Sequence, residues 1–359
     1  MSYFDYAATS PILPEVREAM FKASEKLLGN ASALHSKGHL VHEIIENARL
    51  NIAKYINANP EEIIFTSGST ESNNMVMHTF TDKNIAISNY EHPSIVASAE
   101  AYSKNLHRWS QNQKIPKDIT LVSVMLASNE IGTILDLPHG NFYLHSDATA
   151  AIGKIPIDVK KLDVDYLTIS GHKIGGPSGI GVLYIKKDSP IKPLLFGGNQ
   201  ENNLRPGSHN TIDIIGFDAA IKYALEHDTP KLYKEKVAPL KDYLKNAILK
   251  NIPNTIINTP KEPSLPDILN VSFPGAEGES VQLMLDESDI QVATGSACAS
   301  GKPSAVLMAL TNNPYIASSS IRFSLGLQTT KSDIDKIIEI LPNIIAKLRS
   351  ISAVGEQNE

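Results

Sequence analysis

Cysteine is nearly absent from this 359-residue chain, which contains only Cys298. A single thiol excludes a disulfide within the chain and is typical of a reducing compartment, so we expect a cytoplasmic protein. No apolar run approaches the ~20 residues of a membrane span, and the N-terminus lacks the basic and apolar stretches of an export signal. Positive charge is also scarce: 33 Lys and Arg against 39 Asp and Glu give a net charge of -6. We therefore expect neither nucleic acid nor a membrane as a direct partner.

The remaining composition is that of a globular protein, with 42% hydrophobic and 20% charged residues. A chain of this length buries roughly three quarters of its unfolded surface and commonly divides into domains. We expect a large domain over 14–231 and a small domain formed by 1–13 with 232–359.

Helical and extended patterns alternate in the predicted large domain. Amphipathic spacing predicts helices, and short buried apolar runs predict strands. In chain order the predicted elements are helices Pro14–Leu28 and Val41–Tyr55, strand Ile63–Thr66, a helix through Met77, strand Ile85–Ser88, helix Pro93–Leu106, and strands Leu121–Leu126, Phe142–His145, Tyr166–Ser170 and Gly179–Ile185. This alternation favours an α/β fold with a mostly parallel central sheet.

The pattern changes from about Leu232, where strands and helices follow one another less regularly. The predicted elements are helix Tyr233–Lys250, strand Ile268–Phe273, helix Ser280–Glu287, strand Ile290–Val292, helix Ser304–Leu310, strand Ser319–Ser324 and helix Lys331–Ser350. We expect a smaller α+β domain here.

Two chemically distinctive residues follow neighbouring predicted strands. Asp147 comes just after Phe142–His145, and Lys173 comes just after Tyr166–Ser170. Open α/β sheets bind their ligands at the edge where parallel strands end. An amine that can form a Schiff base and an acid that can face a pyridinium nitrogen are the minimal protein groups for pyridoxal phosphate (PLP). The pair therefore predicts a PLP site, although most lysines are simply solvated charges.

The segment between strand Ile63–Thr66 and the next helix is a candidate phosphate site. Ser69 and Thr70 stand where free backbone N–H groups of a helix start can bind an anion. Serine and threonine are also common helix caps, so this segment alone does not decide the point. Ser170 and His172 offer a second cluster of donors near Lys173.

Cys298 lies in a run of small residues from Thr294 to Lys302. A lone cysteine is usually a small buried hydrophobe. This one has Gly, Ser and Ala as neighbours, which indicates a mobile, exposed loop with little to pack. A thiol is intrinsically nucleophilic, so we expect Cys298 to attack a group held elsewhere.

Together these residues resemble the cysteine desulfurases of the NifS/IscS type, which are PLP enzymes of fold type I. The resemblance runs from Tyr3 to about Leu348 and rests on eight short motifs in order. They are Asp5-Tyr6-Ala7-Ala8-Thr9, Thr66-Ser67-Gly68-Ser69-Thr70-Glu71-Ser72-Asn73, Glu91-His92, Asn129-Glu130-Ile131-Gly132, His145-Ser146-Asp147-Ala148-Thr149, Ser170-Gly171-His172-Lys173, Gly295-Ser296-Ala297-Cys298 and Ser319-Ser320-Ile321-Arg322-Phe323-Ser324.

The resemblance implies a role for each site residue. Lys173, Cys298 and His92 would be catalytic, and Asn129 and Arg322 would bind the carboxylate of the substrate. PLP would be held by Ser69, Thr70, His92, Asn129, Asp147, Ser170, His172, Lys173 and, across a homodimer, Ser208. Taken alone, His92 could be a helix cap and Arg322 a solvated surface charge.

The activity implied by the resemblance is removal of sulfur from L-cysteine, giving L-alanine and a persulfide on Cys298. The sulfur would pass to an acceptor protein in iron–sulfur cluster assembly or tRNA thiolation. Two alternatives remain open: a selenocysteine lyase, which need not use Cys298, and a degenerate paralogue that serves as a scaffold.

The chain departs from the family pattern in three places. Ala150 replaces a glutamine that contacts the phenolic oxygen of the cofactor, so that hydrogen bond is lost. Only a short segment separates Leu126 from Phe142, so we expect no complete helix within 127–141 and a trimmed large domain. The loop between Cys298 and Pro303 is also short, which would limit how far the thiol can travel.

Overall fold

The computed structural model describes residues 2–111, 113–294 and 303–352. The chain forms two compact units, each treated separately below. The larger unit comprises residues 10–126 and 135–229, and the smaller comprises 1–9, 127–134 and 230–359. The predicted domains, 14–231 and 1–13 with 232–359, stay a prediction, because compactness alone does not define an independently folding domain.

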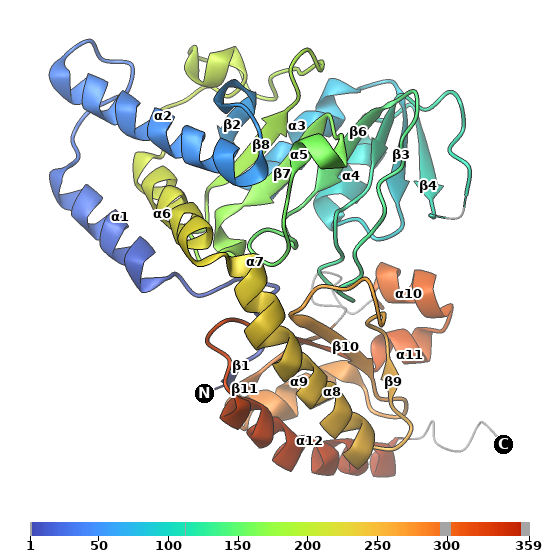
Figure 1. Cartoon of the computed structure of the whole chain (residues 1–359). Helices are drawn as coiled ribbons and strands as arrows, with labels where there is room; N and C mark the ends of the chain where they lie inside the picture. Colours follow the sequence, from blue (N-terminus) through green and yellow to red (C-terminus); the bar gives the residue numbers. More distant parts are fainter. Residues whose placement is uncertain (1, 112, 295–302, 353–359) are drawn as a thin grey trace. The chain divides into compact units, whose positions relative to one another are not determined.

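A seven-stranded mixed sheet forms the centre of the larger unit (Figure 1). Its strands, in spatial order, are β2 (Ile63–Thr66), β8 (Gly181–Ile185), β7 (Tyr166–Ser170), β6 (Tyr143–Asp147), β5 (Leu121–Ser123), β3 (Asn84–Ser88) and β4 (Asn105–Trp109). Only β8 pairs antiparallel, with β2 and β7, whereas β7, β6, β5, β3 and β4 run parallel. The predicted α/β fold with a mostly parallel sheet is confirmed.

Helices accompany this sheet in two groups. One group is α1 (Pro14–Lys26), α2 (Ser36–Ile56) and α6 (Thr211–His227), and α6 packs against the other two. In the other group α3 (Ser69–Thr79) packs on α4 (Pro93–Tyr102) and against β7 and β8. Short helical segments complete the unit: η1 (Pro60–Glu62), α5 (Val159–Leu162), η2 (Gly171–Lys173) and η3 (Gln200–Asn203). A core of apolar side chains, including Met75, Phe80 and Tyr166, fills the space under α3 and α4.

Two parts of the larger unit differ from the prediction. The helix expected over Pro93–Leu106 ends at Tyr102, and the chain then forms β4, because the backbone of Asn105–Trp109 pairs with the edge of β3. Helix α6 was not predicted, although its buried face carries Ile214, Phe217 and Ile221.

The trimmed connection is confirmed. Every residue from 124 to 142 is described, and none lies in a helix. The chain crosses from β5 to β6 as a loop.

The described residues of the smaller unit form two sheets. The four-stranded sheet is antiparallel, in the order β12 (Ala293–Thr294), β13 (Ser320–Ser324), β10 (Ile268–Ser272) and β9 (Ile256–Ile257), and β1 (Ser2–Tyr3) pairs parallel with β11 (Ile290–Gln291). Its helices are α8 (Ala238–Asn251), α9 (Gly278–Asp286), α10 (Ala305–Thr311), α11 (Pro314–Ser318) and α12 (Lys331–Ile351), preceded by α7 (Thr229–Leu232) and the π-helical η4 (Tyr233–Val237). Helices α8 and α9 pack on α12, around Phe4, Phe273 and Phe323.

Within the described ranges, no helix is both long enough and apolar enough to cross a bilayer.

Candidate functional site

Three of the predicted site residues lie at one edge of the central sheet. Asp147 is the last residue of β6, Lys173 ends the helical turn η2 directly after β7, and His92 caps α4 a few residues after β3. Because β3, β5, β6 and β7 are parallel, their carboxyl ends share an edge. The structure therefore brings together the acid, the amine and the histidine that the sequence analysis selected.

Asp147 is buried, and its carboxylate is held by two donors. The amide nitrogen of Asn73 donates to Oδ2 at 2.9 Å, and the backbone N–H of Thr149 donates to Oδ1 at 2.9 Å. An ionised carboxylate has about four acceptor positions, so two bonds orient it without exhausting it. The group is suited to accept a further N–H from a ligand.

His92 is fixed by its position as the N-cap of α4. Its Nδ1 accepts the backbone N–H of Ser94 at 3.2 Å and lies 2.8 Å from Ser94 Oγ. Burial lowers the pKa of His92; the Asp147 carboxylate opposes this effect, and Lys173 adds to it. The imidazole is therefore neutral at pH 7.

His172 lies between the end of β7 and Lys173. Burial, the Lys173 ammonium and the Lys154 ammonium together lower the pKa of His172 to about 4. A neutral imidazole binds a phosphate as an N–H donor rather than as a cation. Lys173 lowers the pKa of both His92 and His172, so its positive charge lies close enough to interact with both imidazole rings.

The start of α3 forms an open cradle of donors. Gly68 has φ of 152°, and a Cβ added there would meet no atom within 4 Å. Strand β8 passes close to Gly68: a Cβ added at Gly181 would lie 2.6 Å from Gly68 Cα. Gly181 is also the pairing partner of Ser170 on β7. Gly68 and Gly181 thus lie between Ser170 and the first residues of α3, Ser69 and Thr70. Ser208 is exposed in the loop before α6.

These residues fit pyridoxal phosphate. The unit provides an amine, an oriented carboxylate, a neutral histidine and a helix N-terminus with free space in front of it. Among the described residues, the buried Thr149 Oγ1 and Asn73 Oδ1 have no hydrogen-bond partner, which leaves polar capacity near Asp147. No group of three or more metal-binding side chains occurs in the described ranges.

Arg322 and Asn129 come together in the smaller unit. Arg322, on β13 and 6% exposed, donates from Nη1 to the backbone oxygen of Asn129 at 2.9 Å. Its Nη2 forms an ion pair with Asp5 Oδ1 at 2.7 Å, and its buried Nε has no partner among the described residues. A substrate carboxylate would therefore share the guanidinium with Asp5, and Nε remains as an unused donor.

Cys298, the predicted nucleophile, lies in 295–302 and is outside the described residues. Its predicted mobility and exposure stay predictions.

Several residues without a predicted role also lie at the sites. Asn73 and Ser94 contact Asp147 and His92, and Asp5 pairs with Arg322. Asn73 and Asp5 belong to two of the eight motifs, and Ser94 follows His92-Pro93. The sequence therefore contained a signal that could have identified these residues as part of the sites.

Glu91 is a further buried acid beside this site. Its Oε1 accepts from Ser88 Oγ at 2.6 Å and from the Met125 N–H at 2.7 Å, whereas its Oε2 has no partner among the described residues. Burial, helped by the charge of Asp147, raises the pKa of Glu91 to about 8. Glu91 is therefore protonated at neutral pH.

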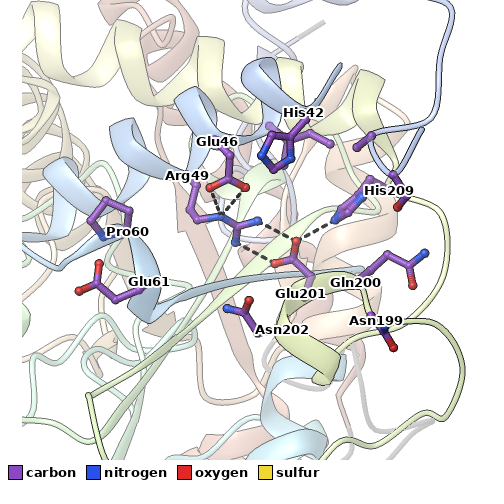
Figure 2. A pocket seen from close by; sticks show the side chains of 13 residues that line it. His42, Glu46, Arg49, Pro60, Glu61, Asn199, Gln200, Glu201, Asn202 and His209 are labelled. Carbon is purple, nitrogen blue, oxygen red and sulfur yellow. Dashed lines mark hydrogen bonds and ion pairs between the residues drawn. The ribbon is translucent and has the colours of Figure 1, made fainter. Parts of the chain in front are cut away.

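A separate cavity of about 620 Å³ lies beside α2 and the 199–202 segment (Figure 2). Arg49 makes two bonds of 2.8 Å to the Glu201 carboxylate, which also contacts His209 Nε2 and accepts the Phe65 N–H. Glu46 bonds to Arg49 Nε at 3.2 Å. The charges of Arg49 and Glu201 satisfy one another, so the arrangement is that of a structural brace.

Comparison with known proteins gives consistent matches over the whole chain. The aminotransferase class-V family model matches residues 2–337. The cysteine desulfurase IscS of Dictyoglomus turgidum is 40% identical over 384 aligned positions, covering 99% of this chain and 97% of the relative. The mitochondrial cysteine desulfurase of Arabidopsis thaliana is 36% identical, covering 99% of this chain and 84% of that protein. The crystal structure of a NifS-like protein from Rickettsia africae has a TM-score of 0.88 at 32% identity, covering 96% of this chain and 99% of that one.

Proposed function

Because the chain belongs to the aminotransferase class-V family and, within it, to the cysteine desulfurases of the IscS/NifS type, we propose that it removes sulfur from L-cysteine. The products would be L-alanine and a persulfide on Cys298. The family uses pyridoxal phosphate. The observation that carries the proposal is the meeting of Asp147, His92 and Lys173 at one sheet edge.

When bound, pyridoxal phosphate supplies an electron sink for the α-carbon of an amino acid. Lys173 would hold it through Nζ and then move protons with the same atom. Asp147 would accept the ring N–H with the lone pairs that Asn73 and Thr149 leave free. His92 would lie on the ring face.

The phosphate would be bound by the donors around Gly68. Ser69 and Thr70 at the start of α3 provide backbone N–H groups and hydroxyls, and Ser170 and the neutral His172 provide side-chain donors. Ser208, exposed in its loop, would serve the phosphate of a second subunit.

In the smaller unit, Arg322 and Asn129 would bind the substrate carboxylate. Arginine recognises a carboxylate through paired N–H donors, and Arg322 Nε is an unused donor. Asp5 holds the guanidinium in place at 2.7 Å.

Cys298 would receive the sulfur, because it is the only thiol of the chain. The C–S bond of the substrate breaks and an S–S bond to Cys298 forms, while a proton replaces sulfur on the substrate carbon. Cysteine and the enzyme thiol thus become alanine and the enzyme persulfide, with no external oxidant or reductant.

We further propose that the enzyme acts as a homodimer and passes its persulfide sulfur to an acceptor protein. Iron–sulfur cluster assembly and tRNA thiolation are the destinations that the family suggests.

The deciding experiment combines a visible spectrum with product assays. The purified protein should be yellow, convert L-cysteine to equimolar alanine and sulfide in the presence of a thiol, and gain 32 Da on Cys298 (roughly the mass of one sulfur atom) before the thiol is added. Cys298→Ala should abolish the activity on cysteine while keeping the colour.

Two results would contradict the proposal. A wild-type protein that turns over selenocysteine but not L-cysteine, with that activity kept in Cys298→Ala, would indicate a selenocysteine lyase. A protein that binds the cofactor but turns over neither substrate would indicate a scaffold.

A further inference from the structure

A chain of three hydrogen bonds connects the histidine and the acid of the proposed site. Ser94 Oγ lies 2.8 Å from His92 Nδ1, Asn73 Nδ2 lies 2.9 Å from Ser94 Oγ, and the same nitrogen lies 2.9 Å from Asp147 Oδ2. All four residues belong to the larger unit. Asn73 is buried in α3, so the bridge is shielded from water.

The direction of each bond follows from donor chemistry. An ionised carboxylate only accepts, so Asn73 must present its NH₂ group, and its second hydrogen reaches Ser94 Oγ. Ser94 Oγ then has its own O–H free to donate to His92 Nδ1. The hydrogen bonds therefore run outward from Asn73: it donates to Asp147 and to Ser94, and Ser94 donates to His92.

The backbone fixes the other end. The Ser94 N–H can only donate, and it points at His92 Nδ1 at 3.2 Å. Nδ1 must therefore be an acceptor, and a neutral imidazole then carries its single proton on Nε2. His35 caps α2 through the same atom, with Nδ1 3.2 Å from the Gly38 N–H.

The geometry points to Asn73 and Ser94 as positioning residues that hold His92 in the Nε2–H tautomer and tie it to Asp147. The inference rests on the proposed function, which gives His92 and Asp147 their roles. It adds that His92 presents a hydrogen-bond donor to the substrate, rather than a base.

The charges around the imidazole agree with this assignment. Burial lowers the pKa of His92, Asp147 on β6 opposes the effect and Lys173 after β7 adds to it. The adjacent Glu91 is protonated at neutral pH and adds no charge. His92 therefore has one proton to place.

The test observes the ring directly. The holoenzyme labelled with ¹⁵N-histidine would be studied by long-range ¹H–¹⁵N NMR at pH 7.5, with the His92 signals identified by their loss in His92→Gln. We expect a protonated Nε2 and an unprotonated Nδ1. A protonated Nδ1, or a charged ring at this pH, would overturn the inference.

Variants then test the two positioning residues. Ser94→Ala removes the hydroxyl bond to His92 Nδ1, worth about 0.5–1.5 kcal/mol, so the tautomer ratio should shift roughly 2–10-fold towards Nδ1–H. Asn73→Ala removes two bonds, one to Ser94 Oγ and one to Asp147 Oδ2, and should shift the ratio in the same direction. Ser94→Thr keeps the hydroxyl and should restore the wild-type pattern.

Matched controls are Asn74→Ala, one residue along α3, and Ser98→Ala, one turn along α4. Asn74 donates to the backbone oxygen of Thr70, and Ser98 donates to the backbone oxygens of Ser94 and Ile95, so both side chains bond elsewhere than to His92. Unchanged His92 signals in both Ser94→Ala and Asn73→Ala would overturn the positioning role. The readout does not depend on turnover, so an inactive enzyme with the expected tautomer would refute only the proposed function.

Discussion

Two buried acids at the sheet edge differ in how their oxygens are used. Asp147 accepts one N–H on each oxygen. Glu91 accepts two bonds on Oε1, and its Oε2 has no partner among the described residues. A buried carboxyl oxygen without a hydrogen-bond partner favours the protonated, neutral form of the acid. Glu91 and Asp147 therefore serve different purposes, although they are close enough for their charges to interact.

The raised pKa of Glu91 predicts a loss of stability at alkaline pH. The folded state keeps the proton up to a pKa of about 8, whereas the unfolded state releases it near 4.5. The stabilising effect is therefore complete below about pH 4.5 and is lost as the pH rises to about 8. Glu91→Gln mimics the protonated acid, so at pH 9 its free energy of unfolding, measured in urea, should exceed that of the wild type by roughly a few kcal/mol.

The comparison at pH 5 serves as the control, because Glu91 is protonated there in the folded wild type. Equal urea midpoints of the two proteins at pH 9 would contradict the raised pKa of Glu91, because ionising this carboxyl would then cost the folded state nothing.

Ala150, which is 7% exposed, offers a second test at the level of one residue. Ala150→Gln should place an N–H donor beside the phenolic oxygen of the cofactor and stabilise its negative charge by about 0.5–1.5 kcal/mol. We expect the pH at which the visible spectrum changes to fall, and turnover to change with it. Ala150→Met, of similar length but without a donor, is the matched control. A spectrum and turnover of Ala150→Gln identical to those of the wild type would show that an amide at this position has no effect on the cofactor.

At the level of elements, the 199–203 segment depends on one carboxylate. Glu201 joins α2 through Arg49 and the segment just before α6 through His209 (Figure 2). It also joins β2 by accepting the Phe65 N–H. Burial would raise the pKa of Glu201, but bonds from Arg49 and His209 outweigh burial and lower it to about 2. The ion pair is thus formed throughout the neutral range.

Removing this carboxylate should be costly. Glu201→Ala leaves the buried Arg49 charge with only the partly exposed Glu46 as a counter-ion. Breaking a buried pair typically costs ~3–5 kcal/mol of the free energy of unfolding, measurable in urea at pH 7. The difference should shrink as the pH falls from about 4.5 to about 2, where the wild-type carboxylate also becomes protonated.

Glu61→Ala is the control, since Glu61 lines the same cavity but is exposed. A loss in Glu201→Ala no larger than in Glu61→Ala would mean that the brace does not support the fold. Adding Arg49→Met to Glu201→Ala should recover part of the stability, because no buried charge is then left unpaired and Glu46 is partly exposed.

For the whole molecule, the proposed homodimer makes a prediction about exposed apolar side chains. Leu34 and Phe196, both in the larger unit, are 91% and 88% exposed in the single chain. Large apolar side chains left in water are typical of surfaces that another chain covers. Phe196→Asp should therefore lower the mass measured by analytical ultracentrifugation towards 39.0 kDa.

Leu249→Asp, on α8 in the smaller unit and 47% exposed, is the control substitution. A wild-type protein that sediments as a monomer would contradict both the dimer and the role of Ser208 across it.

The length of the chain fits its trimmed sheet connections. The alignment with the Dictyoglomus turgidum relative spans 384 positions, more than the 359 residues of this chain, so the relative carries residues that this chain lacks. The loop between β5 and β6 agrees with that difference. Strands β5 and β6 still pair in parallel, because a loop of this length is long enough to cross from the end of one to the start of the other.

The sequence by itself determined the alternation of helices and strands, the mostly parallel sheet and the placement of Asp147 and Lys173 after neighbouring strands. These features follow from local periodicity and from the rule that parallel strands end at one edge. Tertiary structure decided the rest: the bridge from Asn73 to Ser94, the burial of Glu91 and the pairing of Arg322 with Asp5, 317 positions apart. Those contacts join residues distant in the chain, and hydrogen bonds or protonation states between such residues leave no periodic pattern in the sequence.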